Sequence, residues 1–327
     1  MPRFKTRREH SADGQWRDWP EFTNTDEPEG TSQSPEIQNI SQENAGFHEH
    51  DLDESETELP TARRQKSKKL ASNSKKPLMR PVTTKLPLTD KCLHFDDISE
   101  VPGDLQKYYH QRYSIFRYYD YDVRLTHDAW FGVTPEPVAI QVAQDISSSL
   151  FSTPLKDTIV DLFGGAGGNS IAFALSEKWS RVIAIEKDTD TLACAMHNAE
   201  VYGVQDYITF IHGDCLDFLD RLKTATETLD DSLRLDPQST MLFASPPWGG
   251  VNYRDQDVFD LSTMEPYNLE VLHQACKPME HALYLPRTSD LRQIAKLVPD
   301  GTKIDVRQYC MEGASKALVA FLPASFD

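Results

Sequence analysis

TIVDLFGGAGGNSIAFAL, residues 158–175, decides the fold of this chain of 327 residues. It opens with an apolar run of strand length, continues through a glycine-rich turn, and enters a helix predicted to begin near Asn169. Gly164, Gly165 and Gly167 allow the backbone to approach a ligand closely, because no Cβ stands in the way. Taken alone, such a turn is also consistent with a tight connection between a strand and a helix. It lacks the GKS or GKT ending of a nucleoside-triphosphate loop.

Six more apolar runs follow, and helical segments separate most of them. With the first run they span residues 158–163, 181–186, 207–212, 240–245, 281–286, 303–309 and 316–322. This alternation predicts an α/β fold of Rossmann-like type, with a seven-stranded, mostly parallel sheet and helices on both faces. The last two runs lie close together and are expected to form an antiparallel hairpin at one edge. Residues 222–239 are polar and are expected to be an insertion in a surface loop.

The N-terminal part of the chain has a different composition. Residues 1–88 contain few apolar runs and are predicted to be a disordered polar tail. Within it, residues 62–85 form a basic run, which serves as a nuclear import signal, a weak RNA tether or simply a solvated linker. Residues 89–150 are predicted to be a small helical extension, rich in aromatic residues over 101–121. A second helix is expected there, with Thr134 as its N-cap and Pro135 at its first position.

Charge and cysteine usage narrow the classes of function. Residues 1–88 hold 14 basic and 15 acidic side chains, whereas residues 89–327 hold 20 and 36, a net charge of −16. A protein that follows a long phosphate backbone normally presents a broad basic face, so a nucleic-acid substrate must be gripped at a small local feature. The five cysteines form no CxxC pair, which argues against a zinc site and for a reducing compartment. No membrane-spanning run is expected, and we expect no metal site.

Three carboxylates stand where adenosine ligands are held in such sheets. Asp161 precedes the glycine loop in the first strand, Glu186 ends the second strand, and Asp214 follows the third. A carboxylate at the second strand end can accept from both ribose hydroxyls, and one after the third strand can accept from the adenine amino group. An exposed strand-end glutamate is the plainer alternative for Glu186. The order and spacing of the three favour S-adenosyl-L-methionine, with S-adenosyl-L-homocysteine as product, over a dinucleotide.

FASPPWGG, residues 243–250, follows the fourth strand and indicates the reaction. Two consecutive prolines fix φ and have no N–H, so the carbonyl of Pro246 and the hydroxyl of Ser245 can accept the hydrogens of an amine. The amine lone pair is then aimed at an activated methyl group, and positioning supplies most of the acceleration. Trp248 can stack on a base, or can instead cap a structural turn. Arg287, after the fifth strand, either meets phosphate or is an ordinary surface arginine.

These motifs together resemble a known family. DLFGGAGGN, VIAIEKD, HNAEVYGV, SPPWGG and YLPR, with YSIFRYY and WFGVTPE, are similar to the trimethylguanosine synthases over about residues 105–322. The resemblance implies a class I methyltransferase domain over 151–327, with residues 89–150 contributing to the active site. It implies methyl transfer to the exocyclic N2 of 7-methylguanosine caps, giving 2,2,7-trimethylguanosine on small nuclear and nucleolar RNAs.

The resemblance also implies roles for individual residues. Trp248 would stack on the methylated guanine while Ser245 and the Pro246 carbonyl orient N2. The other expected contacts to the cap are Asn198 and, facing its phosphates, Lys107 and Arg287. Phe116 and Thr134 would close over the cofactor. Gly165 departs from the family pattern, because variable residues are common at that position, and the insertion at 222–239 is lengthened.

Other functions remain open from sequence alone. A methyltransferase for adenine N6, internal guanine N2 or protein glutamine would use a similar motif, and a catalytically silent cap-binding protein could share the fold. An NAD oxidoreductase is a further alternative. We expect a monomer that acts on capped RNA, with proteins of ribonucleoprotein particles as partners. We expect it in the nucleus and nucleolus, with a cytoplasmic pool allowed.

Overall fold

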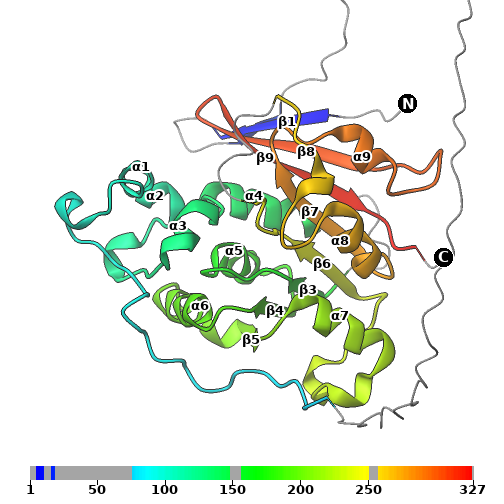
Figure 1. Cartoon of the computed structure of the whole chain (residues 1–327), viewed down its shortest axis with the longest axis horizontal. Coiled ribbons are helices and arrows are strands. Elements are labelled where there is room, and N and C mark those ends of the chain that lie inside the picture. Colours follow the sequence, from blue (N-terminus) through cyan, green and yellow to red (C-terminus); the bar gives the residue numbers. More distant parts are fainter. Residues whose placement is uncertain (1–4, 11–15, 19–75, 148–155, 250–256, 326–327) are drawn as a thin grey trace, which may run out of the picture. The chain divides into compact units, whose positions relative to one another are not determined.

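The computed structural model describes residues 5–10, 16–18, 76–147, 156–249 and 257–325 (Figure 1). Its strands are β1 (Lys5–His10), β2 (Trp16–Asp18), β3 (Thr158–Asp161), β4 (Arg181–Glu186), β5 (Ile208–His212), β6 (Thr240–Ala244), β7 (Glu280–Pro286), β8 (Asp305–Met311) and β9 (Ala314–Leu322). Its α-helices are α1 (Gln106–Tyr109), α2 (Arg112–Ile115), α3 (His127–Gly132), α4 (Glu136–Ser147), α5 (Gly168–Leu175), α6 (Thr189–Val201), α7 (Cys215–Thr224), α8 (Leu269–Cys276) and α9 (Leu291–Ala295).

The predicted seven-stranded sheet is present as β3–β9, and β1 and β2 extend it to nine strands. The order is β2-β1-β8-β9-β7-β6-β3-β4-β5. Strands β3 to β7 are parallel, whereas β9 pairs antiparallel with both β7 and β8. The expected hairpin of the last two runs is therefore confirmed. It is not the edge of the sheet, because β1, from the part of the chain predicted to be a tail, pairs parallel with β8.

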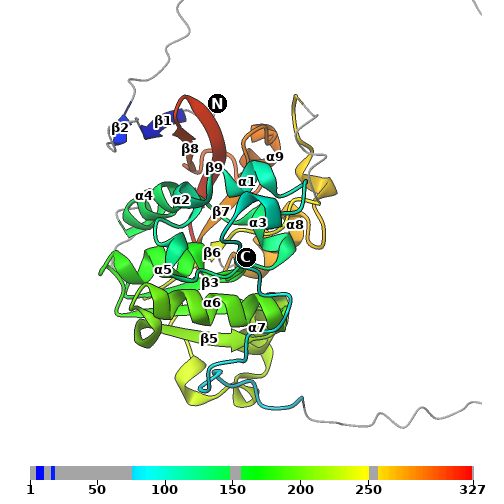
Figure 2. The same ribbon diagram turned by 90° about the vertical axis from the view of Figure 1, so that its left-hand side faces the viewer.

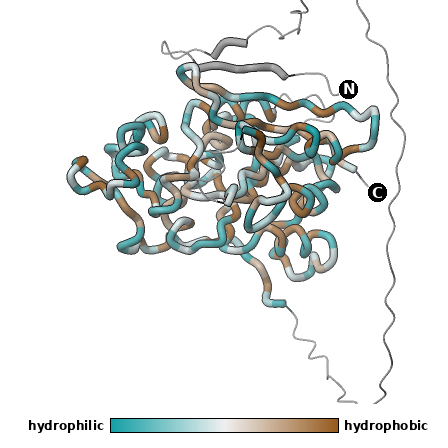
Figure 3. Tube along the Cα trace, turned by 45° about the horizontal axis from the view of Figure 1, so that its top comes forward, coloured by the Kyte–Doolittle hydropathy of each residue, from teal (hydrophilic) through white to brown (hydrophobic). Residues whose placement is uncertain are grey.

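Helices cover both faces of the sheet, as the sequence predicted. Alternate residues of a strand point to opposite faces, so Ile159 packs in a cluster with residues of α4, α5 and α6. Its neighbour Val160 packs in a second cluster with residues of α7, α8 and α9. Figures 1 and 2 show the two helix layers on either side of the strands. Hydrophobic and hydrophilic stretches are interspersed along the folded trace in Figure 3, as expected for elements with one buried face.

The helical extension is made of short turns rather than one helix. α1 and α2 are followed by a single 3-10 turn at Tyr119–Tyr121, and Phe116 between them has extended backbone (φ −138°, ψ 115°). The apolar residues therefore point inward at irregular intervals, and Tyr119 and Trp130 are 1% exposed. The expected second helix is α4, which begins at Glu136, one residue later than predicted.

Residues 76–88, which the sequence analysis placed in the tail, run along the outer edge of the sheet, and we call them the strap. The backbone N–H of Val82 donates to the Phe210 carbonyl of β5 (2.8 Å), and that of Met79 donates to the Thr228 carbonyl (2.8 Å). In Figure 1 the strap is the cyan trace beside β5. An exposed edge strand invites pairing with other chains, so a covering segment protects it. The prediction of a disordered tail over 1–88 is therefore wrong for the strap and for β1 and β2, and its remaining residues, 1–4, 11–15 and 19–75, lie outside the described residues.

The polar insertion at 222–239 is more than a surface loop. α7 continues to Thr224, and two 3-10 turns follow. Leu229 and Leu233 are 2% and 0% exposed and belong to the core beneath α7. The expectation of a surface loop was wrong for these two leucines, because isolated apolar residues in a polar stretch have no periodicity that reveals their burial.

The strand order brings the two predicted motifs together. β3 lies between β4 and β6, and Asp161 is in register with Phe243. The N–H of Leu162 donates to the Phe243 carbonyl (2.8 Å), so the pairing continues just past the end of β3. The chain after β3 and the chain after β6 therefore leave the sheet side by side. This is the switch point where ligands of such sheets bind.

Candidate active site

The glycine loop folds tightly against the end of β4. The N–H of Gly164 donates to the Ile185 carbonyl (2.7 Å), and that of Gly167 to the Gly164 carbonyl (2.9 Å). A Cβ on Gly164 would stand 3.3 Å from the Ile185 carbonyl oxygen, so a larger residue would require the loop or the strand to shift by a few tenths of an ångström. Gly167, the N-cap of α5, has φ +94°, a conformation that favours glycine.

Glu186 holds this loop from the neighbouring strand. One carboxylate oxygen accepts from the N–H of Gly165 (2.9 Å), and the other accepts from the N–H of Asp188 (2.8 Å). Burial raises the pKa of Glu186, although these backbone donors act in the opposite direction. The acid is therefore partly buried and fixed in orientation. The plainer alternative of an exposed strand-end glutamate is not what the structure shows.

Asp161 lies beneath the loop with 0% exposure. Its carboxylate accepts from the Ser170 hydroxyl (2.6 Å) and from the N–H of Phe163 (3.3 Å). Burial raises the pKa of Asp161 to about 7, with those two donors opposing the shift. Its hydrogen bonds join the end of β3 to the first turn of α5. Its contact with the cofactor stays a prediction.

Asp214 caps α7 and meets two residues that the sequence reasoning missed. One oxygen accepts from the N–H groups of Leu216 (2.9 Å) and Asp217 (3.3 Å). The other accepts from the Lys187 ammonium (3.2 Å) and from the Tyr267 hydroxyl. Burial acts to raise the pKa of Asp214, but these donors outweigh it and lower the pKa.

Only one of these two partners carries a signal in the sequence. Lys187 directly follows Glu186, so its place at the end of β4 could have been inferred. Tyr267 lies 53 residues after Asp214, in a stretch without a periodic pattern. Its ring is 6.3 Å from that of Phe163, centroid to centroid. The two rings therefore lie beside the carboxylate that was assigned to adenine.

Asn169 links the glycine loop to the proline motif. Its Nδ2 group donates to the Thr134 hydroxyl (3.2 Å) and to the Ser245 hydroxyl (3.5 Å). Phe116 and Thr134 are 2% and 4% exposed, and both lie within about 4 Å of the position of a Cβ on Gly168. The structure thus gathers Thr134, Phe116 and Ser245 at the start of α5, although the sequence brings them from three separate segments.

These residues fit S-adenosylmethionine. Asn169 is 7% exposed, and its Oδ1 accepts no hydrogen bond from the described residues. A buried acceptor without a donor costs about 1–3 kcal/mol, so a ligand ammonium or hydroxyl at this point is favoured. Glu186 ends β4 and Asp214 follows the adjacent strand β5, so their carboxylates suit the ribose hydroxyls and the adenine amino group. Glu186, Asp214, Asn169 and the glycine loop would hold the cofactor, which supplies an activated methyl group when bound.

Trp248 is half-buried at the end of the proline motif. Its indole lies on the ring of Tyr284, with centroids 6.0 Å apart and planes 14° from parallel, and its N–H donates to the Tyr284 carbonyl (3.4 Å). It also packs against both core clusters. Pro246 is buried beside it, while Pro247 is exposed. The indole therefore has a structural role, and its stacking on a base stays a prediction.

The predicted contacts to the cap lie in different environments. Lys107 on α1 and Arg287 after β7 are exposed. Asn198 is 0% exposed. Its Nδ2 donates to the carbonyls of Arg124 (2.8 Å) and Ala166 (2.9 Å), and its Oδ1 accepts from the N–H of Arg124 (2.8 Å). A direct contact with a cap would break these bonds. Asn198 therefore fits better as a structural residue whose hydrogen bonds join α6 to the extension and to the glycine loop.

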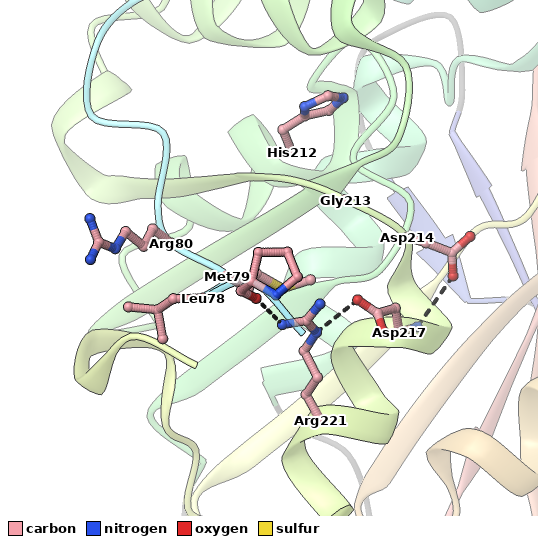
Figure 4. A pocket seen from close by; sticks show the side chains of 9 residues that line it. Leu78, Met79, Arg80, His212, Gly213, Asp214, Asp217 and Arg221 are labelled. Carbon is pink, nitrogen blue, oxygen red and sulfur yellow. Dashed lines mark hydrogen bonds and ion pairs between the residues drawn. The ribbon is translucent and has the colours of Figure 1, made fainter. Parts of the chain in front are cut away.

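A surface cavity of about 420 Å³ lies between the strap and α7 (Figure 4). Arg221 crosses it and donates to the Pro77 carbonyl (2.6 Å) and to the Asp217 carboxylate (2.7 Å). Asp214 lines the far side of the cavity and also faces Tyr267. The strap therefore abuts the predicted adenine end of the site.

No three His, Cys, Asp or Glu residues lie together as a metal site, and no helix could cross a membrane, within the described ranges.

The sheet order, with β9 inserted antiparallel between β7 and β8, and the site at its switch point define a Rossmann-like S-adenosylmethionine-dependent methyltransferase. A family model described as RNA cap guanine-N2 methyltransferase matches residues 156–325. The trimethylguanosine synthase of Schizosaccharomyces pombe is 34% identical over 224 residues, which cover 68% of this chain and 87% of that protein. This chain therefore belongs to the RNA cap guanine-N2 methyltransferase family, whose members methylate cap guanine at N2.

Two further comparisons are more distant. The trimethylguanosine synthase of Saccharomyces cerevisiae is 31% identical over 198 residues, which cover 59% of this chain and 58% of that protein. Among solved structures, the N-terminal domain of human METTL16 in complex with SAH has a TM-score of 0.43 at 15% identity, over 68% of this chain and 84% of that one. The latter likeness is too distant to carry a conclusion about function.

Proposed function

We propose that this enzyme converts the 7-methylguanosine cap of RNA to 2,2,7-trimethylguanosine. The observation that carries the proposal is the link between the two motifs. Asn169, in the first turn of α5 directly after the glycine loop, donates to Ser245 of the proline motif, so the cofactor side and the amine-binding side share one hydrogen-bond network. The relatives named trimethylguanosine synthase support the same product.

The chain's own residues suit an amine acceptor. Pro246 and Pro247 have no N–H, so the backbone there offers only carbonyl acceptors. Ser245 receives one hydrogen bond from Asn169, which leaves a lone pair on its hydroxyl for an amine hydrogen. No strong base is required before attack, because the amine proton becomes acidic only as the new C–N bond forms. Orientation of the lone pair is therefore the main contribution of the protein.

The 7-methyl group gives the base a positive charge. An indole stacked on a cation gains about 0.5–2 kcal/mol from cation–π attraction. Trp248 is half-exposed beside Ser245 and can supply that face. We infer that the enzyme selects guanine that already carries the 7-methyl group.

The test compares matched caps. The enzyme is incubated with labelled S-adenosylmethionine and with cap dinucleotides that carry or lack the 7-methyl group, and the nucleosides are then separated. We expect label in 2,7-dimethylguanosine and 2,2,7-trimethylguanosine from the methylated cap alone. Equal labelling of the unmethylated cap would refute the selection, and label on adenine N6 or on added protein would replace the proposed substrate.

The cellular substrates and location extend the proposal. We propose small nuclear and nucleolar RNAs as substrates, delivered by proteins of their particles to a monomeric enzyme in the nucleus. Within the basic run, Lys76 pairs with Asp217 (2.9 Å) and Lys85 with Glu200, so these two charges are engaged by the folded part. Residues 62–75 are then the better candidate for an import signal. Neutralising their lysines and arginines should move a fluorescent fusion to the cytoplasm, and unchanged nuclear signal would exclude this segment.

A further inference from the structure

Three tyrosines of the helical extension expose their rings, and we call them the tyrosine surface. Tyr113, Tyr118 and Tyr121 are 48%, 42% and 72% exposed. Large aromatic rings are usually at least partly buried, so several exposed rings on one short segment indicate a binding surface. Tyr113 is in α2, Tyr121 is in the 3-10 turn that follows it, and Tyr118 is the N-cap of that turn. Figures 1 and 2 show this part of the extension near α1 and α3.

Two arginines lie against these rings. The Arg112 guanidinium stands over the rings of Tyr109 (4.1 Å) and Tyr113 (4.3 Å), centroid distances in both cases. Arg117 lies 5.4 Å from the ring centroid of Tyr118. Alternating aromatic rings and guanidinium groups are the surfaces on which unpaired nucleotides stack.

The surface is held in shape before any ligand arrives. The Tyr113 hydroxyl donates to the Asp120 carboxylate (3.0 Å), and the rings of Tyr118 and Tyr121 pack edge to face at 5.8 Å. Tyr118 also packs on Tyr202, with centroids 5.0 Å apart. Little side-chain entropy remains to be lost on binding, which favours weak contacts such as stacking.

The position of the surface points to RNA as its occupant. Phe116, two residues before Tyr118, is buried against the start of α5, next to the glycine loop. Lys107, expected to face the cap phosphates, is exposed on the adjoining helix α1. A cap is the 5′ end of an RNA, so the following nucleotides must leave the site across neighbouring surface. The folded part is strongly acidic as a whole. Here, however, Arg112 and Arg117 lie beside the exposed rings, so the surface combines positive charge with the stacking faces that unpaired bases need.

We propose that the tyrosine surface binds the unpaired nucleotides that follow the cap, by stacking on Tyr113, Tyr118 and Tyr121. The proposal rests on the proposed function, because it requires a capped RNA as substrate. It predicts that the enzyme prefers a capped RNA over the isolated cap, and that this preference resides in the extension and not in Trp248.

The test measures KM for two substrates, a 7-methylguanosine cap dinucleotide and a capped unstructured RNA of about ten nucleotides. The wild-type enzyme should have the lower KM for the longer RNA. Tyr121→Ala should raise that KM roughly tenfold, the loss expected for one stacked base. It should leave KM for the dinucleotide unchanged. Tyr121→Phe, which keeps a ring, should behave as wild type.

A matched control is available on another part of the surface. Tyr207 is 69% exposed, just before β5, and Tyr207→Ala should change neither KM. Equal KM values of the wild-type enzyme for both substrates would overturn the proposal, as would an equal effect of Tyr121→Ala and Tyr207→Ala. In that case a protein partner is the better occupant of the surface. Absence of turnover on the dinucleotide would instead count against the proposed function.

Discussion

The glycine-loop side of the site and the proline-motif side are built in different ways. On the loop side, the carboxylate of Asp161 is buried and that of Glu186 is partly buried, and both receive hydrogen bonds from the protein's own backbone or side chains. On the other side, Ser245 and Trp248 are only half-buried, and Arg287 is exposed. Groups already bonded within the protein contribute to folding as well as to binding, whereas groups left at the surface serve the substrate. Substitutions on the two sides should therefore have different consequences.

The largest effect is expected on the proline-motif side. Trp248→Ala removes the expected stacking face and the contact with Tyr284, and should lower transfer to the cap dinucleotide by roughly a thousandfold, about 4 kcal/mol of barrier. Affinity for S-adenosylhomocysteine, measured by calorimetry, should stay within about threefold, because Trp248 is on the substrate side of the site. A threefold change in affinity is less than about 1 kcal/mol. Trp248→Phe keeps a ring and serves as the control. Full activity of the alanine variant would remove the stacking role.

On the loop side, a substitution of Asp161 should change how the free energy of unfolding depends on pH. The unfolded chain loses this proton near pH 3.8, whereas burial keeps it bound to about pH 7 in the folded protein. The folded state thus binds the extra proton between these values, and its stability falls as pH rises from about 4 to about 7. The shift corresponds to at most about 4 kcal/mol.

Asp161→Asn cannot ionise, so this part of the pH dependence should disappear. Urea unfolding of the cofactor-free protein at pH 5 and pH 8 measures it. The variant should gain stability relative to wild type as pH rises. Glu186, whose pKa is also raised by burial, contributes a slope of the same sign in both proteins. If the difference in unfolding free energy between the two proteins were the same at pH 5 and pH 8, Asp161 would be ionised in the folded state at both values.

Asn198 was predicted on the cap side, but its contacts place it with the loop side. Asn198→Ala leaves the backbone groups of Arg124 and Ala166 without partners and should cost about 2–3 kcal/mol of unfolding free energy. Its KM for the cap should change no more than its KM for S-adenosylmethionine. A selective rise in KM for the cap, with unchanged stability, would restore the predicted contact.

The two sides also differ in how far the sequence predicts them. The strands, the glycine loop and the acids near strand ends follow from local patterns, and Asp161 ends β3, Glu186 ends β4 and Asp214 follows β5, while their contacts with the cofactor stay predictions. The burial of Asn198 and the approach of Tyr267 to Asp214 depend on contacts between distant segments, which local patterns do not contain. The same holds for Leu229 and Leu233 in the polar insertion. Short β1 and the strap were also missed, because their ordering depends on edges that only the assembled sheet provides.

The smallest expected effect concerns Tyr267, which joins a distant segment of the chain to the predicted acid Asp214. Tyr267→Phe keeps the ring beside Phe163 but removes the hydroxyl that donates to Asp214. The pKa of Asp214 should then rise, because this hydroxyl helps to lower it. A carboxylate with a lowered pKa stabilises the fold above its unfolded pKa, and that contribution is lost as pH falls through the folded value. In Tyr267→Phe, the free energy of unfolding should therefore begin to fall at a slightly higher pH on acidification than in the wild type.

Cofactor affinity should change little in the same variant. The Tyr267 hydroxyl orients the ionised Asp214 and does not itself contact the ligand, so we expect an affinity for S-adenosylhomocysteine at pH 7.5 that is weaker by roughly two- to threefold, less than about 1 kcal/mol. Lys187→Ala, which removes the other side-chain donor to the same oxygen, is the matched comparison. If Asp214 accepts from the adenine amino group, the two variants should lose affinity for S-adenosylhomocysteine but not for a fragment that lacks adenine. Equal losses for both ligands would move Asp214 out of the adenine site and leave it only the role of capping α7.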